Sequence, residues 1–352
     1  MILKYGLDEE EKWNEIVKSF KNYDVYYIAD YLKAFKVHGD GEPTLFYYEG
    51  ENIRAFNVVM LRDISTDKNF GGLLDSGTYF DISTPYGYGG FIIEGQVTDE
   101  NIRILDEEYI LICKKYGIIS EVVRFHPVFK NVELVKNMYD VTELGKTINI
   151  NLESQEQIWA DIAAKNRNVI RKAKKSNVEI YWGRDPNLIH KFKEVYEMTM
   201  DRDEADEYYY FKDDFYISVL KDLKYNSMIF YAVYEEKIIS ISMILFANNQ
   251  MHYHLSASNK EFQYLAPTNL LLYEAANWGV ENGFESFHLG GGLGSNEDSL
   301  YKFKKVFNKK SDLSFSLGKK IINKEKYDEL ILIRKESSDF NEESQFFPLY
   351  RA

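Results

Sequence analysis

The sequence is poor in cysteine and has no long apolar run. Cys113 is the one cysteine among 352 residues, so no intramolecular disulfide framework can form, and a reducing, cytoplasmic setting is the default expectation. The longest apolar stretches, such as LAPTNLLLY, fall far short of the ~20 residues that span a bilayer, so we expect at most peripheral membrane contact. The first residues, MILKYGLDEEEKW, turn acidic before an apolar segment develops, which predicts no signal peptide.

The chain also lacks an excess of positive charge. Its formal net charge is −13, which argues against a surface made for DNA. Lysine and arginine are nevertheless concentrated in two segments, KNRNVIRKAKK (165–175) and KFKKVFNKK (302–310). Segments of this kind are either solvated helix faces or local sites for anions.

Two nucleotide-binding loops are missing as well. The segment FHLGGGLG (287–294) resembles a phosphate loop, but a dinucleotide loop requires Gly-x-Gly-x-x-Gly, and the third position here is Ser295. The glycine-rich loop of an acetyl-CoA site is expected before the helix of the second repeat. The segment there, EFQYLAPTN (261–269), contains no glycine, and Pro267 removes a backbone donor. We therefore expect the glycines of 290–294 to turn the chain after a buried strand and to let a substrate approach the backbone.

What the sequence does contain is an internal repeat. Residues 45–125 and 228–292 both predict a strand hairpin, a further strand, a loop, a helix and a closing strand. In both copies a glycine ends the helix before the closing strand, since CKKYGIISEVVRF in the first copy corresponds to GVENGFESFHLGG in the second. A repeat of this length predicts two similar α/β domains with a cleft between them. We place their boundaries at 1–148 and 149–336, followed by a polar tail, 337–352.

The segments outside the repeat have helical or extended patterns of their own. Helices are predicted near 155–175, 187–202, 212–223, 298–308 and 323–336. The strand LSFSLG precedes the last of them, and the apolar FFPLY near the end of the tail is expected to pin that end to the body of the protein.

Three ordered segments carry a resemblance to a known family. NRNVIRKAKKSNVEI, YHLSASNKEFQYLAPTNLLLYEAANWGVENGF and FHLGGGLGSNEDSLYKFKKVF together resemble the Fem family of peptidoglycan-bridge aminoacyltransferases. The resemblance covers most of residues 150–310. It implies two tandem GNAT-like acyltransferase domains that transfer an aminoacyl group from aminoacyl-tRNA to an amine of a cell-wall precursor. No heptad run is long enough for the helical hairpin that some Fem enzymes carry, so we expect a compact relative.

The resemblance also implies a catalytic position. A Phe-Lys pair of the family maps onto Phe303 and Lys304, on the short predicted helix after the glycines. Phe303 shares an apolar face with Leu300 and Phe307, whereas Lys304 is expected to point toward the rim. A fixed ammonium there would stabilise the oxygen that gains negative charge when an ester or thioester carbonyl is attacked.

The attacking amine has to be neutral, so a proton acceptor is also sought. Strand alternation predicts that His252 and His254 face the same side, with His288 on the neighbouring strand, and Glu274 is a further candidate base. The alternative for each of these residues is a structural role, as a buried polar side chain whose hydrogen bonds are made within the core. No cysteine or tight carboxylate spacing accompanies the histidines, so we expect no metal site.

Donor contacts are expected from two helices. On the basic helix, Arg167, Arg171 and Lys174 share one side, where they would contact phosphates of a tRNA acceptor stem or of a nucleotide diphosphate. The helix that begins at Pro267 offers its N-terminus to an anionic donor. Solvated side chains are the alternative interpretation of the basic helix.

Acceptor contacts are expected from the first domain. In the bend TPYGYGG, Tyr86 and Tyr88 supply hydroxyl groups and the glycines permit close approach. Lys33, in DYLKAF, is placed near an early strand-to-helix join and is the third candidate.

These features define one expected function and two alternatives. We expect an N-acyltransferase that moves an aminoacyl group, or a simple acyl group, to an amine of a cell-envelope precursor. The first alternative is an acyl-CoA-dependent N-acetyltransferase acting on an amino sugar or another small amine, and the second is a non-catalytic binding protein on the same fold. No tightly bound cofactor is expected, because aminoacyl-tRNA or acyl-CoA would be a co-substrate.

Overall fold

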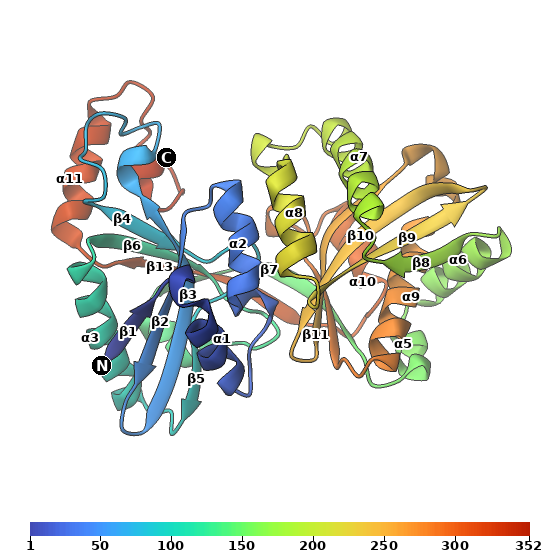
Figure 1. Ribbon diagram of the computed structural model, residues 1–352, viewed down its shortest axis with the longest axis horizontal. Helices are drawn as coiled ribbons and strands as arrows, with labels where there is room; N and C mark the ends of the chain where they lie inside the picture. The colour runs from blue at the N-terminus through green and yellow to red at the C-terminus, as the bar shows by residue number, and fades with distance from the viewer. The chain divides into compact units, whose positions relative to one another are not determined.

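The computed structural model describes residues 1–352 and divides into two compact units (Figure 1). Unit 1 comprises residues 1–144 and 315–352, and unit 2 comprises residues 145–314. The chain leaves unit 1 within β7 (Asp140–Asn151) and returns to it within β13 (Leu313–Ile321). The expected boundary at 336 and the separate tail therefore do not coincide with these units, because residues 315–352 pack on the sheet of unit 1.

Unit 1 is built on a mixed sheet with the strand order β1-β2-β3-β4-β6-β13, and β5 pairs with the first half of β3. Only β4 and β6 run parallel. Besides β13, its elements are β1 (Ile2–Tyr5), α1 (Glu10–Ser19), α2 (Ala29–His38), β2 (Glu42–Glu49), β3 (Ile53–Asp63), β4 (Phe80–Ser83), β5 (Ile92–Gly95), α3 (Asp99–Lys115), β6 (Ile118–Arg124), α4 (Val132–Val135) and α11 (Lys324–Lys335).

The sheet of unit 1 is apolar on both faces because successive residues of a strand point to opposite sides. In β6, Ile118 packs in the core that includes Tyr109 and Cys113 of α3, whereas Ile119 packs with Tyr327 of α11. All five of these side chains are buried. The two helices therefore cover opposite faces of the sheet.

The end of the chain is anchored in unit 1, as the apolar FFPLY predicts. Tyr350 is fully buried, and its hydroxyl contacts Ser120 at 2.8 Å and donates to Asp81 at 3.0 Å. Arg351 forms ion pairs of 2.6 Å with both Asp81 and Asp67. These contacts attach the last residues to the strand β4 and to the loop that precedes it.

Unit 2 is built on a second mixed sheet, with the order β7-β12-β11-β10-β9-β8, in which only β11 and β12 run parallel. Figure 1 shows α7 and α9 on opposite sides of its strands β8 to β10. Besides β7, its elements are α5 (Gln155–Asp161), α6 (Ala164–Lys175), β8 (Glu179–Gly183), α7 (Pro186–Arg202), α8 (Asp213–Asp222), β9 (Ser227–Tyr234), β10 (Lys237–Ala247), β11 (Gln250–Ser258), α9 (Pro267–Glu281), β12 (Ser286–Gly290) and α10 (Ser299–Lys305).

The two sheets have the same order. Read from one edge, β1-β2-β3-β4-β6-β13 of unit 1 corresponds to β8-β9-β10-β11-β12-β7 of unit 2, and the single parallel pair occupies the same place in both. In each unit one helix, α3 or α9, connects the two parallel strands. The duplicated α/β fold predicted from the repeat is confirmed. None of the helices combines the length and the apolar character needed to cross a lipid bilayer.

Candidate active site

The parallel strands of unit 2 separate soon after they begin to pair. β11 and β12 are in register at Gln250–Ser286, Met251–Phe287 and His252–His288, and no pairing follows. β11 continues to Ser258, whereas β12 ends at Gly290. In open α/β sheets, ligands bind at the carboxyl ends of parallel strands, at the point where the strand order reverses. This end of unit 2 is therefore the candidate active site.

A β-bulge lies on β11 at this separation. Its neighbour β10 is in register at Met243–Leu255 and Ile244–Tyr253, so His254 is the extra residue of the bulge. Such a bulge interrupts the alternation of side chains and redirects them, and bulges are frequent beside active sites. The prediction that alternation places His252 and His254 on one face therefore does not apply, because it assumed a regular strand.

Lys304 is the charged residue placed at this end of the sheet. It lies on α10, which Asp298 caps by accepting a hydrogen bond of 2.8 Å from the backbone N–H of Tyr301. The Lys304 side chain is buried, and its Nζ donates to the carbonyl oxygen of Gly291 at 2.7 Å and lies 5.9 Å from the centre of the Tyr253 ring. The expectation that it points toward the rim is wrong, because its stem runs back over the loop that follows β12.

Burial changes the acidity of Lys304. No carboxylate lies at ion-pair distance, and loss of hydration lowers its pKa to about 8, although the charge of Asp298 acts in the opposite direction. The ammonium form is therefore present at neutral pH and is lost as the pH rises past that value. Asp298 stays ionised, because hydrogen bonds from the backbone N–H groups of Tyr301 and Leu293 lower its pKa.

The glycines after β12 shape the loop under Lys304. Gly290 and Gly294 have φ angles of 75° and 56°, which glycine adopts without strain. A Cβ atom on Gly292 would collide with the backbone oxygen of Asn296 and the carboxylate of Asp298. The loop is thus a tight turn that presents the Gly291 carbonyl to Lys304. This agrees with the expected turn after a buried strand rather than with a dinucleotide loop.

Hydroxyl groups surround Tyr253. The Oγ atoms of Ser242 on β10 and Ser256 on β11 are 3.0 Å apart. Burial raises the pKa of Tyr253, and the hydrogen bonds of both serines oppose this change in part. The sequence does not predict this group, because the serines are distant in sequence and come together only in the register of β10 and β11.

The candidate bases are placed differently from one another. Burial, and then the charge of His252, lowers the pKa of His254 to about 3, so its imidazole is neutral at physiological pH. The ring of His288 lies 5.7 Å from that of His252 and is almost fully buried. Glu274 faces α6 rather than the strand ends, because its carboxylate forms an ion pair of 2.6 Å with Lys174.

The predicted donor side chains of α6 are largely engaged within unit 2. Arg167 donates to the carbonyl oxygen of Ile162 at 2.7 Å and thereby closes the end of α5. The guanidinium of Arg171 lies 5.0 Å from the centre of the Trp159 ring. Their role toward phosphates stays a prediction, and on the same helix Lys165, Lys172 and Lys175 are exposed to solvent.

The N-terminus of α9 lies next to the start of α6. Pro267 is buried at the first helical position, after Ala266 in the left-handed conformation. The side-chain amide of Asn269 donates to Oδ1 of Asn166 at 2.8 Å, and the buried Nδ2 of Asn166 has no hydrogen-bond partner. The first turns of both helices contain no acidic residue.

Phe303 packs against the apolar core of unit 2.

The three predicted acceptor residues lie in unit 1. The hydroxyl group of Tyr31 donates to the carbonyl oxygen of Tyr86, whose ring stacks on that of Phe35 at 5.5 Å. Burial raises the pKa of Tyr88 to about 12. Lys33 forms ion pairs with Glu10 at 2.5 Å and with Asp30 at 3.3 Å. The structure therefore brings the tyrosines into one aromatic cluster and engages Lys33 with carboxylates.

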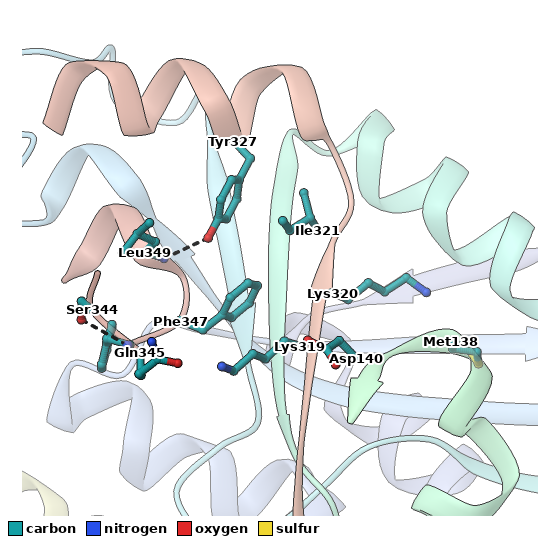
Figure 2. Close-up of a pocket in the computed structure, with 11 residues that line it drawn as sticks. Met138, Asp140, Lys319, Lys320, Ile321, Tyr327, Ser344, Gln345, Phe347 and Leu349 are labelled. Atoms are coloured by element: carbon teal, nitrogen blue, oxygen red, sulfur yellow. Dashed lines mark hydrogen bonds between the residues drawn. The ribbon is translucent and has the colours of Figure 1, made fainter. Parts of the chain in front are cut away.

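A cavity of about 530 Å³ also lies in unit 1, between β13, the start of α11 and the end of the chain (Figure 2). Tyr327, Phe347 and Leu349 are among its lining residues, and the Tyr327 hydroxyl accepts a hydrogen bond of 2.9 Å from the backbone N–H of Leu349. Lys319 lies 5.8 Å from the centre of the Phe347 ring. None of the site residues predicted from the sequence lines this cavity.

Comparisons with known proteins agree with this geometry. The family model for the acetyltransferase (GNAT) domain matches residues 163–305, which lie within unit 2. The crystal structure of FemX has a TM-score of 0.67 at 14% identity and covers 94% of this chain and 100% of its own. No match to the sequence is found among curated proteins.

Two further solved structures share the fold. A conserved protein of unknown function from Bacteroides thetaiotaomicron has a TM-score of 0.58 at 12% identity, covering 91% of this chain and 99% of its own. The C-terminal domain of a putative lysylphosphatidylglycerol synthetase from Agrobacterium fabrum has a TM-score of 0.56 at 13% identity, covering 89% and 92%. Residues 163–305 thus match an acetyltransferase domain of the GNAT type, and the chain as a whole has the Fem-like double GNAT fold.

Proposed function

We propose that the protein transfers an aminoacyl group from aminoacyl-tRNA to an amine of a cell-envelope precursor, and that unit 2 holds the reaction centre. The observation that carries this proposal is Lys304, a buried ammonium without a carboxylate partner at the carboxyl ends of the parallel strands. A charge held there acts in a site with little water, where it stabilises a developing negative charge more than it would in solution.

The proposed reaction is a direct attack in a ternary complex. The neutral amine nitrogen attacks the ester carbonyl carbon, and the carbonyl oxygen takes up negative charge that Lys304 stabilises. The carbon–oxygen bond to the tRNA ribose then breaks, the amide forms, and the amine proton passes to the departing ribose oxygen, which leaves as a hydroxyl group. No covalent enzyme intermediate is needed, and Cys113 is buried, away from solvent.

Proton transfer is assigned to a relay rather than to a strong base. With a pKa of about 3, the His254 imidazole accepts and passes on a proton but does not retain it near neutral pH. His288 lies on the adjacent strand, at the register position of His252. We assign the relay to these histidines together with solvent, and we assign no role in it to Glu274, which is paired with Lys174.

The donor assignment is supported by the Fem-like fold over nearly the whole chain and by the exposed lysines of α6. Solvent-facing lysines on one helix suit the phosphates of an acceptor stem, which are bound as a row of charges. The aminoacyl donor and the nucleotide-linked precursor are both cytoplasmic compounds, so we place the reaction in the cytoplasm.

An acyl-CoA donor is the second candidate, and one observation favours it. The first turn of α9 carries no acidic residue, so the positive end of the helix dipole is not neutralised and attracts a phosphate. The missing glycine loop and Pro267 argue against it, because they remove the backbone donors of an ordinary CoA site.

A donor screen tests both candidates. Purified protein is supplied with charged tRNAs or with acyl-CoAs, in each case with nucleotide-linked amino sugars and precursor peptides as acceptors, and amide formation is followed by mass spectrometry. The proposal predicts product with charged tRNA that disappears when the tRNA is deacylated. Product with acyl-CoA alone would replace it by the second candidate. Absence of product from every donor would reject both.

A further inference from the structure

One arginine of the chain is unlike all the others. Of the ten arginines, nine donate hydrogen bonds from their guanidinium groups to carboxylate, amide, hydroxyl or carbonyl oxygens. The tenth, Arg124, is exposed and has no hydrogen bond or ion pair from its side chain. In a chain with 56 acidic residues and a net charge of −13, a guanidinium left without an oxygen partner requires an explanation.

Arg124 occupies a defined place in unit 1. It is the last residue of β6, at the carboxyl end of the parallel pair β4 and β6. Its guanidinium lies 5.7 Å from the centre of the Phe315 ring, and the Tyr88 ring lies 5.6 Å from that same ring. The charge of Arg124 also lowers the pKa of Tyr88 against the larger effect of burial. The guanidinium and the phenol therefore share one electrostatic environment.

The backbone around Arg124 is fixed. Its N–H donates to the hydroxyl oxygen of Thr84 at 3.3 Å, and its carbonyl oxygen accepts a hydrogen bond of 2.8 Å from the N–H of Gly89. The carbonyl oxygen of Gly89 in turn accepts a hydrogen bond of 2.9 Å from the buried amide of Asn131. The chain that carries Tyr88 is thus attached directly beside the end of β6. An aromatic ring beneath a guanidinium further restricts its orientation while leaving the N–H groups available.

These features are those of an oxyanion-binding residue. A guanidinium presents paired N–H donors that match a carboxylate or a phosphate, and a preorganised side chain loses little entropy when it binds. Neither the tyrosines nor Phe315 offers a negative charge to satisfy it. A ligand that supplies an oxyanion would complete the hydrogen bonding of the group.

We propose that Arg124 binds an oxyanion of the acceptor substrate, a carboxylate or a phosphate, while the rings of Tyr88 and Phe315 pack beside it. This inference rests on the proposed function, because it takes the ligand of unit 1 to be the acceptor amine. It assigns to Arg124 the selection of anionic acceptors over neutral ones, and it assigns no part in the chemical step.

Direct binding measurements test this assignment without requiring turnover. Three acceptor analogues are titrated by calorimetry at low salt: a nucleotide diphosphate-linked amino sugar, a peptide amine with a free carboxylate, and the same peptide as its neutral amide. In the wild type, one anionic analogue binds more tightly than the amide, and which one does so identifies the oxyanion. Arg124→Ala weakens that binding by about ten- to hundred-fold, the range for a lost charge-assisted hydrogen bond, and leaves amide binding unchanged.

Two variants control for charge and for folding. Arg103→Ala removes an exposed arginine of the same unit that is paired with Glu100 and Glu107, and it should bind all three analogues as the wild type does. Arg124→Lys keeps the charge but loses the paired donors, so it should recover part of the affinity. Melting temperatures verify that each variant is folded.

The results separate this inference from the proposed function. Equal binding of charged and neutral analogues by the wild type, or equal weakening of all three in Arg124→Ala, would overturn the role of Arg124. Failure of every donor in the screen would reject the proposed acyl transfer, yet it would leave the Arg124-dependent binding measurable. If transfer occurs, Arg124→Ala should raise KM for the acceptor and leave KM for the donor unchanged.

Discussion

Units 1 and 2 have the same strand order but differ where their parallel strands end. In unit 1 the chain after β4 stays attached to β6, through hydrogen bonds from the N–H groups of Thr84 and Gly89 to the carbonyl oxygens of Val122 and Arg124. In unit 2, β11 and β12 have no pairing beyond His252 and His288. The chain beyond the parallel strands is therefore hydrogen-bonded across their ends in unit 1, whereas the corresponding strands of unit 2 separate.

The helices α3 and α9 also differ between the units, in the charge of their first turns. α3 begins with Asp99 and Glu100, and Thr98 caps its first turn, so acidic groups already neutralise its N-terminus. α9 begins at Pro267 with no acidic residue in its first turn. A negatively charged donor would therefore be repelled at α3 and attracted at α9. The two units therefore share a fold but differ at the helix end where we propose that the donor binds.

The largest expected effect is on Lys304. Replacing Lys304 with methionine removes the charge that stabilises the oxyanion, and we expect kcat to fall by about 10²- to 10³-fold, the range for a lost oxyanion donor. The melting temperature should rise by a few degrees, because the variant no longer buries an ammonium. Steady-state kinetics and thermal unfolding of the same preparation test both statements. A variant that loses stability along with activity would indicate a structural role instead.

The second prediction concerns the closed end of unit 1. The amide of buried Asn131 donates to the carbonyl oxygens of Gly89 and Phe91 and accepts from the backbone N–H of His126. Asn131→Ala leaves these three groups unsatisfied, and we expect a loss of about 2–4 kcal/mol in unfolding free energy. Hydrogen exchange should increase at residues 84–91.

The exposed Asn137 provides the matched control for this change, because it is a nearby asparagine of the same unit with no side-chain hydrogen bond. Asn137→Ala should keep wild-type stability. If Asn131→Ala unfolds at the wild-type denaturant midpoint, other contacts hold the loop, and the closed strand end of unit 1 does not depend on Asn131.

The third prediction is a pH dependence. Lys304 is charged below its pKa of about 8 and neutral above it, so the activity that depends on it should decline by about tenfold per pH unit above that value. The stability of the protein should change in the opposite sense. Between about pH 8 and the unfolded pKa of 10.5, the unfolded chain binds more protons at Lys304, so the free energy of unfolding rises with pH.

An arginine substitution tests whether Lys304 causes the decline in activity above pH 8. Lys304→Arg keeps its charge across the whole range, so any residual activity of the variant should not decline near pH 8. A wild-type profile that continues to rise from pH 7 to pH 10, measured with saturating substrates, would contradict the role of the ammonium.

The sequence predicts the duplicated fold and places Lys304 on a short helix after the glycines, but it does not predict the surroundings of this lysine. The repeat predicted two matching sheets, because hydrophobic periodicity and the Gly117 and Gly283 helix ends are local signals. The burial of Lys304 was not predictable in this way, because it depends on a hydrogen bond to Gly291 across a tight turn. The return of β13 to unit 1 likewise depends on its pairing with β6, nearly 200 residues earlier in the chain.

Irregular geometry and missing partners explain the other differences. The bulge at His254 arises from a shift in register between β10 and β11, for which the sequence of β11 has no distinct signal. The residue types of Arg167 and Glu274 predict a phosphate contact and a candidate base, respectively. In the structure Arg167 donates to a carbonyl oxygen and Glu274 pairs with Lys174, both within unit 2. Arg124 cannot be identified from the sequence for the converse reason, since only the structure shows that its guanidinium has no hydrogen bond or ion pair.

The smallest effect is expected from a substitution that gives α9 an acidic first turn, as α3 has. Asn269→Asp places a negative charge in the first turn of α9 at almost no change in shape, and Asn166, whose Nδ2 has no partner, can donate to it. If the donor places a phosphate at this helix end, its KM should rise about two- to five-fold with kcat unchanged. Asn282→Asp adds the same charge beyond the opposite end of the helix and should leave donor KM as it is. A donor held by the lysines of α6 gives a different result: Lys172→Ala and Lys175→Ala would raise its KM, and Asn269→Asp would not. The relative size of these changes therefore shows which helix binds the donor, whatever its chemical identity.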